Sequence, residues 1–190
     1  MRNTSSLSRL TYRDLLELPE DGLRHELIDG EHYVTPAPGE RHQSASFRLS
    51  GLLFEYLRRQ PIGRAYAAPF DVLLSELDFV EPDLIYLSNE RWQRQMNRHR
   101  LVGPPDLVVE ILSPSTHKID EGAKLRLYER SGIGEYWLID PVGETVRVHR
   151  LEAGRLQLHA ELARERGAPA PVLTTPLLPD FQAPLDCIFA

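Results

Sequence analysis

The chain has 190 residues, of which 42% are hydrophobic and 26% are charged, and this composition fits one globular domain over residues 1–190. It contains no apolar run of signal-peptide or membrane-spanning length, so we expect a cytoplasmic protein. Its single cysteine, Cys187, leaves no internal disulfide and no cysteine-based zinc cluster to expect. The net charge of -6 is unfavourable for binding nucleic acid, and such a partner would require a local patch of basic residues.

The first third of the chain predicts two helices separated by a hairpin. A segment with a capping-box pattern predicts a short helix over residues 11–18. Residues 23–35 alternate around Asp29-Gly30, a pair typical of a two-residue hairpin turn. Apolar side chains then recur at helical spacing over residues 45–57, which predicts a long helix packed on a core.

The middle of the chain predicts a strand, a helix and a second strand. The run LVVEIL at 107–112 is typical of a central strand covered on both faces, although it contains Glu110. Asp120 is expected to cap a helix that ends near Ser131, before a strand at 136–139, and this order favours parallel strands. Other strands are expected at 65–68, 70–74, 84–87, 145–150 and 156–159, and an apolar tail at 177–189 that includes Cys187 is expected to join the core.

Glu110 requires an explanation, because a carboxylate is rarely buried unless it is paired or bound to a cation. It either forms an ion pair with an arginine at a strand end or binds a metal. Asp83 opens a different strand and is the expected partner, whereas Asp106 lies about 13 Å along the same strand and is expected to be a turn or cap residue. Two carboxylates and a backbone carbonyl suit Mg²⁺, and the histidines lack the spacing of zinc motifs.

Several motifs stand in one order along the chain: HELIDGE, PAPGERH, EPDLIYLS, PPDLVVEILSPST, then Asp120, Lys124, Tyr128 and GIGEYWLIDP. From roughly residue 12 to residue 179 the chain resembles the Uma-two type restriction endonucleases, within the PD-(D/E)XK nuclease superfamily. This resemblance implies an α/β fold with a restriction-endonuclease-like core, in which helices flank a central mixed β-sheet. The N-terminal helix and hairpin are expected to precede this core in the chain. It also implies two acidic residues on adjacent strands that hold Mg²⁺.

Asp83 and Glu110 match the two acids of this family. The superfamily usually has a lysine two residues after the second acid, but this chain has Leu112 there. The family resembled here places its lysine in the following helix, where Lys124 stands, and a flexible stem allows its ammonium to reach the same space. Since the basic residues include only two lysines, Lys118 and Lys124, the presence of a lysine at this position carries weight. A solvated helix residue is the alternative for Lys124.

The resemblance implies a mechanism for these residues. Asp83, Glu110 and the carbonyl of Ile111 are the expected Mg²⁺ ligands, with Mn²⁺ able to substitute, and Lys124 is expected to orient or deprotonate the attacking water. Glu26 matches a further acidic position of the family and is expected to assist a second metal or to orient water; a surface residue of the hairpin is the alternative.

The expected partner is nucleic acid, most naturally DNA, and a homodimer would suit cleavage of both strands. Basic residues with an aromatic neighbour suit backbone contacts and base stacking. The candidate contacts are Arg91, Arg94, Arg98, Arg100 and, just before the long helix, His42. Two other functions remain open: a catalytically inactive nuclease-fold module for nucleic-acid binding or assembly, and a metal-dependent hydrolase acting on RNA or a small phosphoester.

Overall fold

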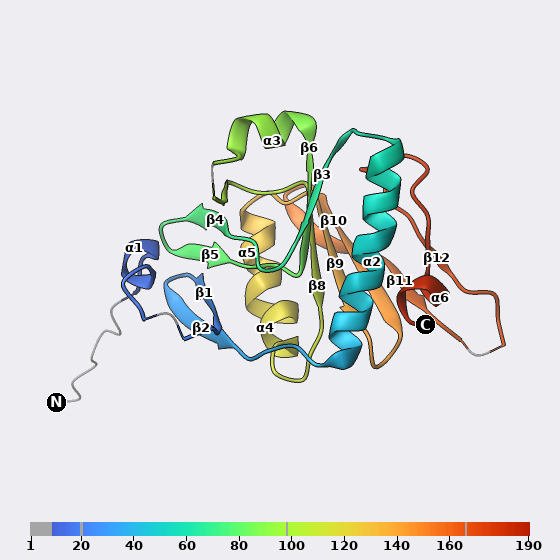
Figure 1. The fold of residues 1–190 in the computed structure, drawn as a ribbon, viewed down its shortest axis with the longest axis horizontal. Coiled ribbons are helices and arrows are strands. Elements are labelled where there is room, and N and C mark those ends of the chain that lie inside the picture. Colours follow the sequence, from blue (N-terminus) through green and yellow to red (C-terminus); the bar gives the residue numbers. More distant parts are fainter. Residues whose placement is uncertain (1–8, 20, 98, 166) are drawn as a thin grey trace.

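A six-stranded mixed sheet forms the centre of the molecule, with strand order β11-β10-β9-β8-β6-β3 (Figure 1). The computed structural model describes residues 9–19, 21–97, 99–165 and 167–190. β8 and β9 are parallel and the other neighbours are antiparallel, as the order of strand, helix and strand predicted. The strands are β3 (Gly63–Ala67), β6 (Leu84–Ser88), β8 (Leu107–Ile111), β9 (Glu135–Asp140), β10 (Thr145–Glu152) and β11 (Arg155–Ala163).

A five-stranded sheet of order β2-β1-β5-β4-β7 lies beside the large one (Figure 1). Its hairpin turns at Asp29 and Gly30, whose φ angles of 55° and 75° are both positive, as the predicted tight turn requires. The sequence pattern did not predict β5 and β7. The strands are β1 (Arg24–Ile28), β2 (Glu31–Thr35), β4 (Val72–Ser75), β5 (Asp78–Val80) and β7 (Leu101–Val102), and a separate pair is formed by β12 (Val172–Leu173) and β13 (Ala183–Pro184).

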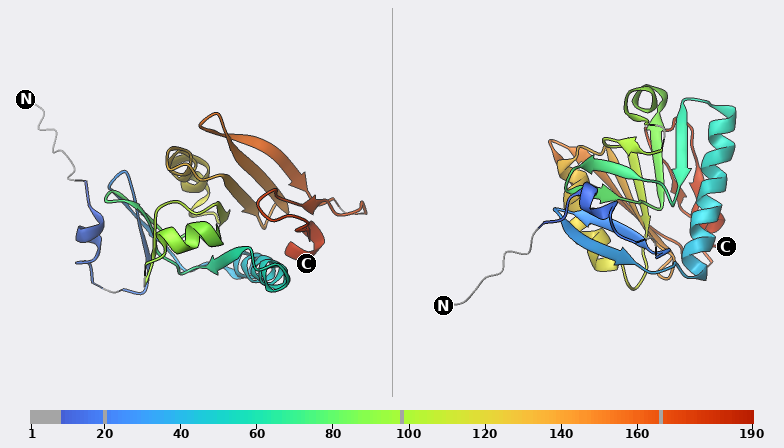
Figure 2. Two further views of the ribbon diagram at one scale, coloured as in Figure 1. Left: turned by 90° about the horizontal axis from the view of Figure 1, so that it is seen from above. Right: turned by 60° about the vertical axis from the view of Figure 1, so that its left-hand side comes forward.

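Helices cover both faces of the large sheet (Figure 2). Along β8, Leu107 and Val109 belong to the core beneath α2, whereas Val108 belongs to the core beneath α5. Glu110 shares the second face, because side chains alternate along a strand. The helical elements are α1 (Tyr12–Leu15), α2 (Glu40–Arg59), α3 (Asn89–Gln95), α4 (His117–Ile119), the π-helical η1 (Asp120–Lys124), α5 (Leu125–Arg130) and α6 (Leu185–Ile188). Among the described residues, no helix combines the length and apolarity that a membrane crossing requires.

The C-terminal tail packs on the core beneath α2, as predicted. Phe181 and Leu185 are buried in that core, and the hydroxyl of Tyr56 on α2 donates a hydrogen bond to the carbonyl of Pro179 at 2.7 Å. Cys187 was expected to be buried with this tail and is exposed instead, since α6 is one turn long and directs its buried side chains to the other side.

The expected helix cap at Asp120 is also wrong. Helical backbone begins at His117, so Asp120 lies inside a continuous helical segment rather than at its start. Its side chain is 2% exposed and is directed into the protein. The segment ends at Ser131, followed by Gly132 with a φ of 74°, in agreement with the predicted stop.

Candidate active site

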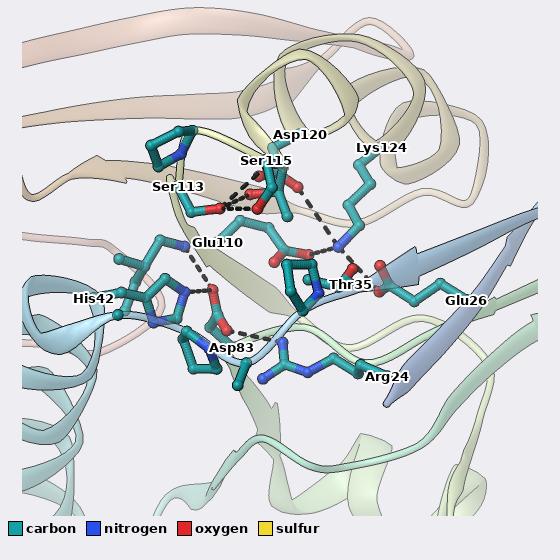
Figure 3. Close-up of a pocket in the computed structure, with 17 residues that line it drawn as sticks. Arg24, Glu26, Thr35, His42, Asp83, Glu110, Ser113, Ser115, Asp120 and Lys124 are labelled. Carbon is teal, nitrogen blue, oxygen red and sulfur yellow. Dashed lines mark hydrogen bonds and ion pairs between the residues drawn. The ribbon is translucent and has the colours of Figure 1, made fainter. Parts of the chain in front are cut away.

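A pocket of about 230 Å³ lies where β1, β6, β8, the start of α2 and the helical segment 117–130 meet (Figure 3). The loop over residues 36–39 forms part of its wall. Its polar and charged lining residues are Arg24, Glu26, Thr35, His42, Asp83, Glu110, Ser113, Ser115, Thr116, Asp120 and Lys124. The pocket thus brings together predicted site residues from five separate segments: Glu26, His42, Asp83, Glu110 with Ile111, and Lys124.

Asp83 lies directly before β6 and is 3% exposed. Its Oδ1 accepts a hydrogen bond from Nη1 of Arg24 at 3.1 Å, while its Oδ2 accepts the backbone N–H of Ile111 at 2.8 Å and lies 3.0 Å from Nε2 of His42. Burial alone would raise the pKa of this carboxyl. The contacts with His42 and Ile111 and the charge of Arg24 outweigh burial, and the pKa is lower than usual. Asp83 is therefore an ionised and firmly oriented carboxylate.

Glu110 lies next to Asp83, because the antiparallel register pairs Leu84 with Val109. It is 2% exposed, and its Oε1 accepts hydrogen bonds from Nζ of Lys124 at 3.0 Å and from the hydroxyl of Tyr128 at 2.6 Å. Burial raises the pKa of Glu110 well above its usual value, and the nearby carboxylates add to this effect against the charge of Lys124. The ion-pair partner of Glu110 is a lysine rather than the arginine considered from the sequence.

Lys124 is buried, not a solvated helix residue (Figure 3). Its Nζ is 3.0 Å from Oε1 of Glu26 and 3.6 Å from Oδ1 of Asp120, in addition to its contact with Glu110. Burial would lower the pKa of this amine, but the three carboxylates raise it well above its usual value. Lys124 is therefore a cation, positioned by a π-helical segment of the kind that is rare and frequently found at functional sites.

Glu26 and Asp120 complete the acidic lining of the pocket. Glu26 is 2% exposed and its Oε1 also accepts the backbone N–H of Glu81 at 2.9 Å, so it is not a surface residue of the hairpin. Oδ1 of Asp120 is buried without a hydrogen-bond partner, and burial raises the pKa of this carboxyl. An aspartate near a helix start is usually a cap, so the sequence alone did not predict that Asp120 lines the pocket.

Arg24 is a second pocket residue that the sequence reading missed. It precedes Glu26 by two positions on β1, and residues two apart in a strand share a face. This periodicity was available in the sequence once Glu26 had been singled out. Arg24 pairs with Asp83 and also donates to the carbonyl of Glu81 at 3.4 Å.

The arginines of residues 91–100, which were predicted to contact nucleic acid, are not among the described lining residues of this pocket. This stretch follows β6, whereas Asp83 precedes β6, and the strand separates the two by roughly 17 Å at 3.3 Å per residue. Arg91 pairs with Asp106, which also accepts the backbone N–H of Ser88. The other described arginines form contacts of their own, Arg94 with Glu90 and Arg100 with Tyr12, and Arg98 lies outside the described residues.

The pocket contains more negative than positive groups. Four buried carboxylates (Glu26, Asp83, Glu110 and Asp120) face two cations (Lys124 and Arg24), which leaves a formal charge of -2 among these six side chains when all are ionised. Within the described part of the chain, however, no three His, Cys, Asp or Glu side chains form a ready-made metal cluster. The charge and the oxygen donors fit a divalent cation. Asp83, Glu26 and Oε1 of Glu110 have hydrogen-bond partners, whereas Oδ1 of Asp120 has none.

A mixed sheet flanked by helices, with acids and a lysine gathered at one end, defines a restriction-endonuclease-like fold. A solved structure described as a "putative nuclease belonging to DUF820" from Anabaena variabilis matches 95% of this chain and 97% of its own, with a TM-score of 0.77 and 21% identity. The sequence profile of the family Uma2, described as "Putative restriction endonuclease", matches residues 12–186. The chain belongs to the Uma2 family.

A curated relative is less informative about function. An uncharacterized protein of Synechocystis sp., slr1290, is 28% identical over 116 residues. The match covers 61% of this chain and 60% of that protein.

Proposed function

We propose that this protein is a divalent-metal-dependent endonuclease that hydrolyses phosphodiester bonds in DNA. The observation that carries the proposal is the buried contact of Lys124 with Glu110 beside the oriented carboxylate of Asp83, in a chain of a restriction endonuclease family. A carboxylate pair with a nearby ammonium supplies the charges that phosphodiester hydrolysis requires.

Asp83, Glu110 and the carbonyl of Ile111 would hold Mg²⁺, or Mn²⁺ in its place. The excess negative charge of the pocket and the unpartnered oxygen of Asp120 support this assignment. When bound, the ion polarises the phosphate and makes its bound water more acidic.

The protein side chains have separate tasks in this proposal. Asp83 keeps one orientation because His42 and the Ile111 N–H hold its Oδ2. Lys124 donates hydrogen bonds to the attacking water or to a phosphate oxygen, and Glu26 keeps that ammonium in the pocket. The burial of these groups excludes bulk water, and electrostatic interactions are stronger as a result.

Hydroxyl and guanidinium groups at the pocket are the proposed phosphate contacts. Ser113, Ser115 and Thr116 form a hydrogen-bonded group of hydroxyls on one wall, with Oγ of Ser113 2.9 Å from Oγ of Ser115 and 3.0 Å from Oγ1 of Thr116. Arg24 stands in the pocket with Asp83 and is partly exposed. A guanidinium that keeps part of its surface free can add a phosphate contact to its carboxylate contact.

A homodimer is a further part of the proposal, because cleavage of two strands uses two sites. Phe47 and Phe54 on α2 support it, since both are exposed, by 81% and 68%, and stand seven residues apart on one helix face. Light scattering after size exclusion is expected to give twice the mass of the chain, 43 kDa rather than the 21.7 kDa of one copy at about micromolar concentration. A single-copy mass would refute the dimer alone.

The test of the proposed function combines metal calorimetry with a plasmid nicking assay. Asp83→Asn and Glu110→Gln are expected to abolish both metal binding and nicking, while the surface variant Glu161→Gln retains both. Duplex DNA, single-stranded DNA and RNA are offered in parallel, so that the substrate is measured rather than assumed. Metal binding without cleavage of any of them would favour the inactive nucleic-acid-binding module, and no metal binding at all would refute the nuclease proposal.

A further inference from the structure

The ammonium of Lys124 lies at the centre of three carboxylates. Nζ is 3.0 Å from an oxygen of Glu26, 3.0 Å from an oxygen of Glu110 and 3.6 Å from an oxygen of Asp120, and each of these side chains is at least 96% buried. An ammonium has three donors and no acceptor, so three oxygens are the partners it can satisfy. Lys124 therefore supplies a cation at the point where these three carboxylates meet.

The contact with Asp120 differs from the other two. At 3.6 Å it is an ion pair but not a hydrogen bond, and Oδ1 of Asp120 has no hydrogen-bond partner although it is buried. Leaving a buried acceptor unsatisfied carries the full desolvation penalty of that group. A small movement of the Lys124 ammonium away from Glu110 would satisfy this oxygen of Asp120. Asp120 and Lys124 belong to the same π-helical segment.

In the proposed site, the carboxylate of Glu110 would have two cations beside it. Oε1 of Glu110 already accepts hydrogen bonds from Lys124 and from Tyr128, and the described residues contain no ready-made metal cluster. A divalent cation on either oxygen of Glu110 would lie close to the Lys124 ammonium and would share the charge of the same carboxylate with it. Two cations at close range also repel each other, which adds to the competition.

We propose that Lys124 is an internal competitor of the divalent cation, and that Asp120 receives its ammonium when the cation binds. This inference rests on the proposed function, because it concerns the same site. The ammonium shifts from Glu110 toward Oδ1 of Asp120 without leaving the pocket, and Glu26 remains its partner. Asp120 is thus a positioning residue that acts through Lys124. The ammonium offsets part of the negative charge of the metal-free pocket, and its competition weakens metal binding.

A lysine suits this exchange better than an arginine. Its charge is compact and its four-carbon stem is flexible, so the ammonium can change partners while the helix backbone stays in place. A planar guanidinium with five fixed donors would have to rotate as a whole. The chain uses lysine at only two positions, and the second, Lys118, is exposed six residues earlier and provides a matched control.

The test is isothermal calorimetry with Mn²⁺ on wild type, Lys124→Met, Lys124→Gln and Lys118→Met. Removing the competing ammonium is expected to lower the Kd for Mn²⁺ by about tenfold or more, which corresponds to about 1.4 kcal/mol of lost competition. Lys118→Met removes the same charge from the surface and is expected to leave the Kd within about twofold, because exposed charges are screened. Circular dichroism records the fold of each variant.

Asp120→Asn tests the receiving carboxylate in a double-mutant cycle with Lys124→Met. In the presence of Lys124 the asparagine is expected to weaken Mn²⁺ binding by about tenfold, as 1.4 kcal/mol of coupling predicts. In the Lys124→Met background its effect is expected to be at least about threefold smaller, because no ammonium remains to be received. Asp120→Glu is expected to restore most of the affinity. Equal effects of Asp120→Asn in both backgrounds would overturn the role of Asp120.

The outcomes separate this inference from the proposed function. If wild type binds Mn²⁺ and both Lys124 variants bind it equally or more weakly, competition is refuted and the nuclease proposal stands. If no variant binds Mn²⁺, both are refuted. If the Lys124 variants are unfolded without metal, recovery of the native spectrum at millimolar Mn²⁺ supports competition, and failure of both to recover overturns it.

Discussion

Nζ of Lys124 and Oε1 of Glu110 are 3.0 Å apart, although one residue comes from a helix and the other from the central strand β8. This buried contact joins the helical segment to the large sheet, and the hydroxyl of Tyr128 reinforces it from the same side at 2.6 Å. The same pair buries two charged groups, which carries a desolvation penalty, and several measurable consequences result.

Replacing Glu110 with Gln is expected to stabilise the metal-free protein while removing its activity. The amide still accepts from Tyr128, Lys124 keeps Glu26, and one buried charge of an excess of two disappears. A gain of about 1 kcal/mol would raise the melting temperature by about 2–4 °C in a chain of this length. Calorimetric scans in EDTA at neutral pH measure it. A melting temperature lowered by several degrees would show that the ion pair contributes more than the charge excess costs.

The opposite sign is expected for Lys124→Met in the same buffer. This change leaves four buried carboxylates with Arg24 as their nearby cation, and breaking a buried pair commonly costs about 3–5 kcal/mol. The melting temperature is expected to fall by more than about 6 °C. Lys118→Met, on the surface, is the control and is expected to change it by less than about 2 °C. Equal melting temperatures for the two variants would contradict the buried charge balance.

Arg24 is expected to contribute more to DNA affinity than the arginines after β6. Arg24→Ala removes a cation from the pocket, whereas Arg94 is an exposed residue of α3 paired with Glu90. Fluorescence anisotropy with Ca²⁺ in place of Mg²⁺ measures binding without turnover. A loss of about tenfold or more is expected for Arg24→Ala and less than about twofold for Arg94→Ala. The reverse order would place the nucleic acid at the far end of the sheet.

The stability of the protein is expected to fall as the pH rises from 4.5 to about 7 because of Glu81. Burial raises the pKa of this carboxyl from 4.5 to about 7, with Asp71 adding to the shift and Arg24 opposing it. Within this window the folded chain holds a proton that the unfolded chain has released, so each step up in pH favours unfolding. Glu81→Gln is expected to flatten this part of the profile. Melting temperatures between pH 4.5 and 8 check it, with the exposed Glu76→Gln as the control that keeps the wild-type slope.

The C-terminal tail is expected to be required for stability. Leu185 is fully buried in the core beneath α2, and its truncation to alanine is expected to cost about 2–5 kcal/mol. Val142, 65% exposed, is the control, and its change to alanine is expected to cost less than about 0.5 kcal/mol. Urea titration of both variants distinguishes them. A small loss for Leu185→Ala would mean that the tail docks without supporting the core.

Local signals in the sequence were sufficient for much of the fold. Asp29-Gly30 specifies its hairpin turn because few residue pairs accept two positive φ angles, and the helical spacing of apolar residues predicted α2 although its first turn was missed. The order of strand, helix and strand predicted that β8 and β9 are parallel. Short strands such as β5 could not be predicted, since three residues carry no periodicity and depend on their partners in the sheet.

The site was predicted less completely than the fold. Glu110 stood out because a charge inside an apolar run is conspicuous, and Asp83 was its expected partner because it opens a different strand. The family resemblance added Lys124 and Glu26. Asp120 and Arg24 escaped notice because their importance depends on tertiary position: one was read as a cap, and the other sits among many arginines. A charge run such as that after β6 shows composition but not which end of a strand it occupies.

Because Lys124 lies on a helix, the site is complete only when that helix is docked on the sheet. In a motif carried by one strand, acid and lysine are connected by a few bonds and persist whenever that strand is paired. Here the two meet only while the segment 117–130 is docked, and such segments can open locally at less cost than global unfolding. If the proposed function holds, a molecule with an intact sheet and a detached helix would lack this ammonium, and the level of activity would report the docked fraction.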